Sequence, residues 1–112
     1  MNATAHMDEI CRRVVAAYRK AYGDDIEAIY LYGSYARGDF NEDSDIDFAA
    51  IVKGDRPDVQ KKRWELWNEA DKIDLEFDVL TSPTAIPLSD FRKYGTQSGY
   101  YKNILREGKR LE

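Results

Sequence analysis

The chain has 112 residues, of which 43% are hydrophobic and 34% charged, a size and composition that suit one compact domain with a modest core. Its 17 Lys and Arg against 21 Asp and Glu leave a formal net charge of −4, without the basic excess typical of general nucleic-acid binders. No apolar run approaches the roughly 18 residues of a membrane span, and the single cysteine, Cys11, favours a reducing cytoplasm over a disulfide-forming compartment.

We expect residues 1–112 to form a single domain, with residues 1–7 disordered or derived from cloning. Apolar residues at helical spacing predict an amphipathic helix over about Met7–Tyr22 that stops near Gly23. The short β-branched and aromatic run Ile26–Tyr32 predicts a strand. Asp45–Val52 predicts a second strand, with Ile46, Phe48, Ala50 and Val52 on one face and Asp45, Asp47, Ala49 and Ile51 on the other.

The second half of the chain predicts two more helices and one more strand. Pro57 suits the first turn of a helix whose inward stripe comprises Val59, Arg63, Leu66, Trp67 and Ala70. The two tryptophans, Trp64 and Trp67, are expected in the core rather than as base-stacking platforms. Lys72–Leu80 alternates between apolar and acidic residues and predicts a third strand. Pro83 and Pro87 indicate an irregular link before a last helix that contains Tyr101, Ile104 and Leu105 and ends at Gly108.

This order of elements predicts an α/β (α+β) domain. We expect a small mixed sheet with helices packed on one face and a partly open acidic face on the other.

The stretch "LYGSYARGDFNEDSDIDFAAIV", Leu31 to Val52, has three possible interpretations, of which a calcium-binding loop is the first. If Asp39 is the first position of an EF-hand loop, the sixth is Ser44, where the sharp turn needs Gly. The twelfth is Ala50, where a bidentate Glu is required. The calcium loop is therefore rejected at both positions.

A solvated acidic turn is the second interpretation, and it explains only the middle of the stretch. Asp39, Asn41, Glu42 and Asp43 are of the residue types common in turns. Asp45 and Asp47 instead point to one side of an otherwise apolar strand, with side chains roughly 7 Å apart along it. Two ionised carboxylates at that separation repel each other unless a cation lies between them. This pair therefore predicts a site for a divalent metal.

A phosphate site is the third interpretation, and it applies to the residues that precede the acidic turn. Gly33 follows a strand and permits a tight turn, whose backbone N–H groups can face an anion without a Cβ in the way. Ser34 adds a hydroxyl, and Arg37 can return over the same face to a phosphate. No Walker-type G-x-x-x-x-G-K-[ST] loop occurs in the chain. A metal-bound triphosphate is the ligand that suits both halves of this unit.

A third carboxylate would complete a site for two metal ions roughly 4 Å apart. Asp74, Glu76 and Asp78 lie on one face of the predicted third strand and all qualify. Their spacing alone does not distinguish among them, because the register of that strand is not fixed by sequence.

The spaced motif closely resembles that of the nucleotidyltransferase superfamily with a DNA polymerase β-like palm. Gly33-Ser34 is followed, after ten residues, by Asp45-Ile46-Asp47. The fuller string "GSYARGDFNEDSDIDF" resembles the minimal nucleotidyltransferase (MNT) branch, as do "FDVL" and the closing "YYKNILREGKRLE". By this resemblance, which spans about Ile26 to Leu111, the third carboxylate is Asp78 and the other two candidates are peripheral.

The resemblance implies that AMP is transferred from ATP to an acceptor hydroxyl while pyrophosphate leaves. Asp45 and Asp47 would hold two Mg²⁺ ions, and Asp78 would bind the ion that activates the acceptor oxygen. Gly33, Ser34 and Arg37 would bind the β and γ phosphates.

The MNT branch also implies a partner, since its members commonly act as antitoxins paired with a helical HEPN ribonuclease toxin, and some attach AMP to a toxin tyrosine. A Mg²⁺-dependent protein adenylyltransferase of the antitoxin type is therefore the leading hypothesis. Two alternatives are a small-molecule nucleotidyltransferase subunit of the aminoglycoside-modifying kind and a non-catalytic module that binds nucleotide or a partner. The three acidic residues Asp45, Asp47 and Asp78 favour an active site over an idle one, because unused carboxylates of like charge need not be kept together.

Overall fold

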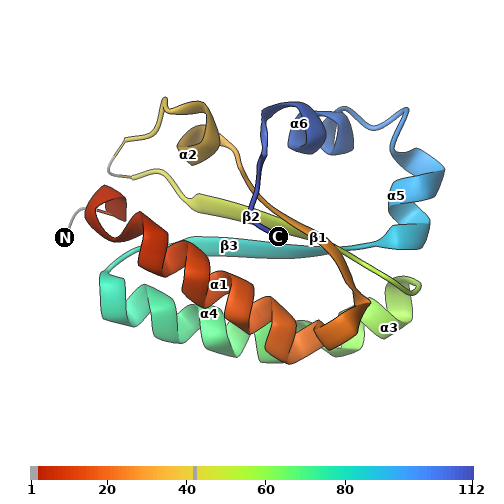
Figure 1. Cartoon of the computed structure of the whole chain (residues 1–112), viewed down its shortest axis with the longest axis horizontal. Helices are drawn as coiled ribbons and strands as arrows, with labels where there is room; N and C mark the ends of the chain where they lie inside the picture. The colour runs from red at the N-terminus through yellow and green to blue at the C-terminus, as the bar shows by residue number, and fades with distance from the viewer. Residues whose placement is uncertain (1–2, 42) are drawn as a thin grey trace.

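The computed structural model describes residues 3–41 and 43–112, which form a four-stranded mixed sheet flanked by helices (Figure 1). The strands are β1 (Ile26–Tyr32), β2 (Ile46–Val52), β3 (Thr81–Pro87) and β4 (Lys109–Arg110). The helices are α1 (Met7–Tyr22), α2 (Ser34–Arg37), α3 (Arg56–Lys61), α4 (Arg63–Phe77), α5 (Leu88–Tyr94) and α6 (Gly99–Glu107), with 3-10 turns at Ala3–His6 and Gly23–Asp25. The predicted α/β class with a mixed sheet is confirmed.

The sheet separates two layers of helices. Its order is β3-β2-β1-β4, with β2 parallel to β3 and the other neighbours antiparallel. The long helices α1 and α4 lie side by side under one face, while α2, α5 and α6 lie over the opposite face (Figure 1). That second face is therefore less open than we expected, because three short helices cover parts of it. No helix in the described ranges is long and apolar enough to cross a membrane.

The first half of the chain folds as its periodicity predicts. Helix α1 buries a stripe that includes Ile10, Val14 and Tyr18, and it ends at Gly23, whose φ is +56°. On β2, Ile46 and Phe48 point into the core beneath the sheet, so Asp47 points to the other face. Ala3–His6 is a short 3-10 turn that leads into α1.

The predicted third strand, Lys72–Leu80, is wrong, because this segment continues helix α4 as far as Phe77. The alternation of apolar and acidic residues there coincides with a helical stripe of buried side chains, which are Leu66, Ala70, Ile73 and Phe77. As a helix, residues 72 to 77 extend the interface between α4 and α1, whereas as a strand they would not contribute to it. The exposed Leu75, with 86% of its surface accessible, is the residue on which the strand pattern depended.

The third strand is instead β3, in the segment where two prolines had indicated an irregular link. Ile46 donates its N–H to the carbonyl of Leu80, and alternate residues of a parallel strand face the same neighbour. The backbone nitrogens of Pro83 and Pro87 therefore face away from β2, toward the open edge of the sheet, where a missing N–H breaks no ladder. The prolines are compatible with a strand only because β3 lies at this edge.

The prediction that both tryptophans lie in the core is also wrong. Trp64 is 70% exposed and Trp67 is 47% exposed, so neither belongs to the core. The predicted helix is split at Lys62 into α3 and α4, and only Val59, Leu66 and Ala70 of its predicted stripe are buried. At the other end of the chain, the predicted helix before Gly108 is confirmed as α6.

A pair of alanine substitutions tests the helical assignment of residues 72 to 77. Ile73→Ala should lower the free energy of unfolding by about 2–5 kcal/mol because Ile73 is buried against the core. Leu75→Ala should change it by less than about 0.5 kcal/mol, since the side chain lies in solvent. Urea unfolding of both variants measures the difference. Equal losses would contradict the helix and favour a strand, in which both residues share one face.

Candidate functional site

The predicted site lies where β1 ends and β2 begins. Tyr32, the last residue of β1, is paired with Asp47 of β2, and Gly33 follows directly. The antiparallel register therefore brings the glycine turn and the aspartate pair together at one end of the β1–β2 strand pair, on the face that α2 and α6 cover. The phosphate half and the metal half of the predicted site are brought together.

Gly33 is required for two separate reasons. Its φ of +74° is a backbone conformation that residues with a side chain rarely adopt. A Cβ at this position would also collide with Oδ2 of Asp47 and lie 3.3 Å from its Cγ. The glycine thus lets the backbone of the turn touch the carboxylate of the neighbouring strand.

The turn after Gly33 is the short helix α2. Ala36 and Arg37 both donate their N–H groups to the Gly33 carbonyl at 3.1 Å, which closes the turn. The amides of Ser34 and Tyr35 belong to the first turn, where a helix has no internal acceptor for its N–H groups. The half-buried Ser34 hydroxyl lies at the same point of the turn. These amides and this hydroxyl are the groups expected to bind phosphate, and that role stays a prediction.

Asp45 lies close enough to Asp47 for its charge to affect the pKa of Asp47. Asp47 is half-buried and Asp45 is exposed. Burial raises the pKa of Asp47, the Asp45 charge raises it further, and the Arg37 guanidinium opposes both effects. The carboxylate pair is therefore an unfavourable arrangement by itself, which a cation would relieve.

Arg37 is held by two acidic side chains. Its Nε donates to Asp39 at 3.3 Å and its Nη1 donates to Glu107 of α6, also at 3.3 Å. These are the partners of a surface arginine, and the guanidinium is still near enough to lower the pKa of Asp47. Ion pairs that are open to water are weak, so a phosphate group can compete for this arginine.

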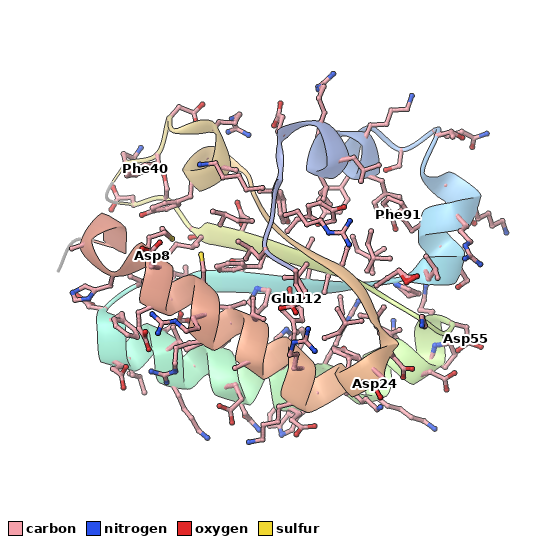
Figure 2. All side chains as sticks on the ribbon, viewed as in Figure 1. Asp8, Asp24, Phe40, Asp55, Phe91 and Glu112 are labelled. Atoms are coloured by element: carbon pink, nitrogen blue, oxygen red, sulfur yellow. The ribbon has the colours of Figure 1, made fainter. Side chains whose placement is uncertain are left out.

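The segment between the two halves of the site is a hydrogen-bonded turn. Asp43 N donates to Oδ1 of Asn41 and Asn41 N donates to Oγ of Ser44, both at 2.9 Å. The ring of Phe40 stacks on Tyr35 of α2 with centroids 4.3 Å apart (Figure 2). The exposed Asp39, Asn41 and Asp43 fit the predicted solvated turn, whereas Glu42 lies outside the described residues.

Asp78 does not lie on a strand. It ends helix α4 in a left-handed conformation with φ +53°, three residues before β3 begins, and its side chain is exposed. Within the described part of the chain, no three side chains of the Asp, Glu, His and Cys types are grouped so as to hold a metal ion. The structure thus joins Asp45 with Asp47 but does not add Asp78 to them, and its role as third carboxylate stays a prediction.

Asp74, another candidate for the third carboxylate, stabilises the start of β3. Its Oδ1 accepts hydrogen bonds from the N–H of Thr81 at 2.8 Å and from the Thr81 hydroxyl at 2.7 Å, at the start of β3. Burial raises the pKa of Asp74, these two bonds lower it, and nearby Asp71 and Asp45 raise it again. The third candidate, Glu76, accepts a hydrogen bond from Arg13 of α1 at 2.6 Å and lies on the helix surface.

Two residues that sequence reasoning missed share the face of Asp47. Ser82 of β3 is its direct partner in the parallel ladder, and Tyr32 is its partner on β1. Burial and then a hydrogen bond with Tyr100 raise the pKa of Tyr32 well above its usual range, so this hydroxyl stays neutral beside the carboxylates. Sequence reasoning missed Ser82 because it expected the strand at Lys72–Leu80, whereas Ser82 lies on β3 at Thr81–Pro87.

The residues at this edge fit a magnesium-bound triphosphate. Mg²⁺ is commonly held by one or two carboxylates together with substrate phosphate oxygens, so Asp45 and Asp47 suffice as the protein's share. The absence of a Cβ on Gly33 leaves the turn in contact with Asp47, where phosphate and metal must meet.

Residues 15–111 match the family described as "Polymerase beta, Nucleotidyltransferase". The chain belongs to the polymerase β nucleotidyltransferase family. The family predicted from the Gly-Ser and Asp-x-Asp motif is thereby confirmed, and the match covers the predicted site residues from Gly33 to Asp78.

Two proteins of Methanocaldococcus jannaschii, both provisionally named protein adenylyltransferases, are similar to this nucleotidyltransferase. One is 30% identical over 104 residues, which cover 93% of this chain and 96% of the relative. The other is 38% identical over 60 residues, which cover 54% of this chain and 59% of the relative.

Solved structures of toxin–antitoxin complexes contain chains with the same fold. One, a toxin–antitoxin with AMP-PNP, aligns over 91% of the nucleotidyltransferase and 72% of its own chain, with a TM-score of 0.59 and 24% identity. Another, a tri-AMPylated Shewanella oneidensis HEPN toxin in complex with MNT antitoxin, aligns over 94% and 71%, with a TM-score of 0.51 and 18% identity. At these identities the likeness concerns the fold.

Alanine at Gly33 should destabilise the nucleotidyltransferase more than alanine at Gly38. Both glycines have positive φ, but Gly38 is left-handed helical with ψ 3°, which costs a residue with a side chain about 1–2 kcal/mol. Gly33 has ψ −154°, a region essentially restricted to glycine, so its backbone strain is larger. Only at Gly33 does the new Cβ also meet Asp47, since the space around Gly38 is open. Urea unfolding should show a further loss of about 1 kcal/mol or more for Gly33→Ala. Equal losses would mean that the contact with Asp47 does not matter.

Asn at position 47 should stabilise the metal-free protein at neutral pH. The pKa of Asp47 is raised in the folded state, so the folded protein binds this proton more tightly than the unfolded chain does. The wild type therefore loses stability as the pH rises through the folded-state pKa, and Asp47→Asn escapes that loss. Thermal melting without metal should place the variant above the wild type at pH 7. The gap should close below the ordinary aspartate pKa of about 3.9; a variant that is less stable at pH 7 would contradict the repulsion.

Proposed function

We propose that this nucleotidyltransferase transfers AMP from ATP to a tyrosine hydroxyl of a partner toxin of the HEPN type. The observation that supports the proposal is the contact between the Gly33 turn and Asp47, because the amides that would bind phosphate then lie directly beside the carboxylates that would bind metal. An ATP bound there would have its β and γ phosphates on the turn and its α-phosphorus at the carboxylates.

In the proposed reaction the acceptor oxygen attacks the α-phosphorus and forms a new P–O bond. The bond from that phosphorus to the oxygen that bridges it to the β-phosphate breaks, pyrophosphate leaves, and the hydroxyl proton passes to solvent. The amides of the turn and the Ser34 hydroxyl would hold the β and γ phosphates. Arg37 would exchange Asp39 or Glu107 for a phosphate oxygen and balance its charge.

Asp45 and Asp47 would hold magnesium, and we propose two ions with Asp78 as a ligand of the second. Bound Mg²⁺ would lower the pKa of the acceptor hydroxyl and neutralise charge that develops on the phosphates. Asp78 lies at a helix end and is exposed, so it would have to approach the pair when substrate binds.

The choice of acceptor is supported by what similar proteins are called. Two relatives carry the provisional name protein adenylyltransferase, and chains of the same fold are found in complexes described as a toxin–antitoxin with AMP-PNP and as a tri-AMPylated HEPN toxin with an MNT antitoxin. Such a reaction requires ATP and a partner in the same compartment, and we propose the cytoplasm, where a lone Cys11 also stays reduced.

Incubation with α-labelled ATP, Mg²⁺ and the product of the adjacent gene tests this proposal. Label should appear on a tyrosine of that product, and Asp47→Asn should lower the rate by about 10²–10³-fold, since metal stabilisation of the transition state amounts to several kcal/mol. Asp43→Asn in the solvated turn is the matched control and should keep the rate within about twofold. Label on a small-molecule hydroxyl, or a stable complex without label, would contradict the proposal.

The same assay decides the role of Asp78. If it is the third carboxylate, Asp78→Asn should lose about as much activity as Asp47→Asn. A rate close to that of the Asp43→Asn control would show that Asp78 only ends helix α4. Thermal melting of each variant separates lost chemistry from lost folding.

A further inference from the structure

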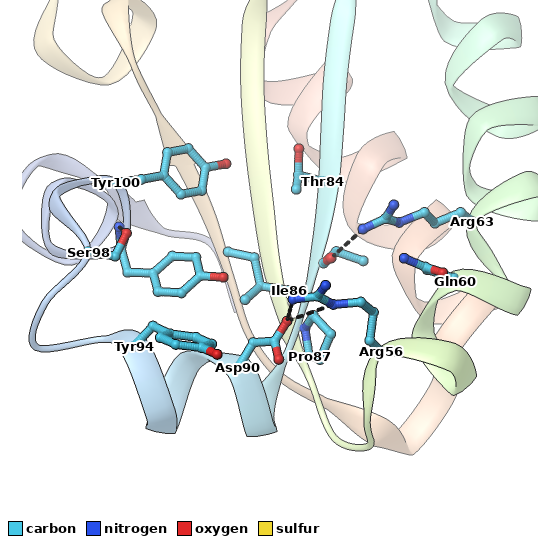
Figure 3. Close-up of a pocket in the computed structure, with 12 residues that line it drawn as sticks. Arg56, Gln60, Arg63, Thr84, Ile86, Pro87, Asp90, Tyr94, Ser98 and Tyr100 are labelled. Atoms are coloured by element: carbon cyan, nitrogen blue, oxygen red, sulfur yellow. Dashed lines mark hydrogen bonds and ion pairs between the residues drawn. The ribbon is translucent and has the colours of Figure 1, made fainter.

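A pocket outside the predicted site lies over the exposed edge of β3. It has a volume of about 430 Å³ and opens between the α3–α4 junction and the α5–α6 segment. Figure 3 shows Arg56, Gln60 and Arg63 on one side and Tyr94 and Tyr100 on the other, with the side chains of β3 between them. One wall is therefore cationic and polar, and the other combines tyrosines with Asp90 and Ser98.

The pocket is connected to the carboxylate pair by a chain of contacts. The hydroxyls of Tyr100 and Tyr32 are 2.9 Å apart, and Tyr32 is the cross-strand partner of Asp47. On the floor, Thr84 follows two residues after Ser82, the other partner of Asp47, and so lies on the same face roughly 7 Å further along β3. A ligand in the pocket would extend toward Asp47 along β3.

The geometry of phosphoryl transfer indicates which substrate would bind on the β3 side of the carboxylates. Attacking and leaving oxygens lie on opposite sides of the phosphorus in an in-line displacement. The cradle that would hold pyrophosphate follows β1, the carboxylates are on β2, and the pocket is over β3, in that order across the sheet. The pocket is therefore on the side from which the acceptor must approach.

The chemistry of the walls indicates an acidic peptide that carries an aromatic residue. Arg63 donates one N–H to the Ala85 carbonyl at 3.3 Å, and a guanidinium has five such donors, so it can bind a carboxylate as well. Arg56 is paired with Asp90 at 2.9 Å and contributes less charge. Tyr100 and Tyr101, with ring centroids 5.6 Å apart, offer an aromatic surface to a further ring.

We propose that this pocket binds the segment of the acceptor protein that surrounds the modified tyrosine, with an acidic residue of that segment on Arg63. The inference rests on the proposed function, because it assigns the second substrate of the same reaction. The adenosine part of ATP is the rival occupant, but adenosine is uncharged and would give Arg63 no anionic partner.

Kinetics of AMP transfer to the adjacent gene product distinguish the two occupants. Arg63→Met removes the charge and keeps the stem, and Tyr94→Ala shortens the aromatic wall at a partly exposed residue. Each should raise KM for the acceptor protein by about tenfold and leave KM for ATP within about twofold. Arg12→Met, on the exposed surface of α1, is the matched control and should change neither constant. A rise in KM for ATP alone, or no change in either constant, would overturn the proposal.

A binding measurement separates failure of the pocket from failure of the proposed function. The peptide N-acetyl-Glu-Tyr-Glu-amide, titrated into ¹⁵N-labelled protein without ATP, should shift the amide signals of Gln60, Thr84 and Tyr94. ATP with Mg²⁺ should instead shift those of Gly33 and Asp47. If no AMP transfer is ever observed but the peptide maps to the pocket, the proposed reaction is wrong and the pocket assignment stands. If transfer occurs and the peptide shifts nothing in the pocket, the assignment is wrong.

Discussion

The close approach of the Gly33 backbone to the Asp47 carboxylate is the constraint on which the rest of the site depends. It follows from the antiparallel register of β1 and β2, which pairs Tyr32 with Asp47 and leaves the next residue directly against that side chain. A Cβ at this position would displace the Asp47 carboxylate from the turn. The register of one strand pair thus fixes the distance between the group that would hold phosphate and the group that would hold metal.

The electrostatics of the two carboxylates, Asp45 and Asp47, are unfavourable without a cation between them. Asp47 is partly withdrawn from water beside Asp45, and both effects raise its pKa. Arg37 offsets part of this from a distance, while its hydrogen bonds go to Asp39 and Glu107. A magnesium-bound polyphosphate would stabilise this site, because the metal ion would offset the repulsion between the carboxylates and the phosphates would pair with Arg37.

Much of this site could be predicted from sequence because it depends on local order. Gly33, Ser34, Asp45 and Asp47 lie at the ends of two strands with clear periodicity, so their common edge follows from the pairing of those strands. The third strand could not be predicted in the same way. Residues 72 to 77 satisfy both a strand and a helix pattern, and the packing of Ile73 and Phe77 with the α1 layer decides between them. Pro83 and Pro87 argued against a strand at 81–87, and only knowledge that β3 is an edge strand removes the objection. Trp64 and Trp67 show the same limitation, since helical spacing does not reveal which face of a helix is covered.

The outer edge of β3 has a consequence for how other molecules can recognise this protein. Its outward positions are occupied or blocked in succession: Asp74 accepts the Thr81 N–H, Pro83 and Pro87 have no N–H, and Arg63 bonds the Ala85 carbonyl. An extended chain that added itself to the sheet here would lack three of the usual main-chain donors, those of Thr81, Pro83 and Pro87, so growth of the sheet from one molecule to the next is disfavoured. Recognition at this edge therefore depends more on side chains, which can discriminate between partners in a way that a row of peptide groups does not.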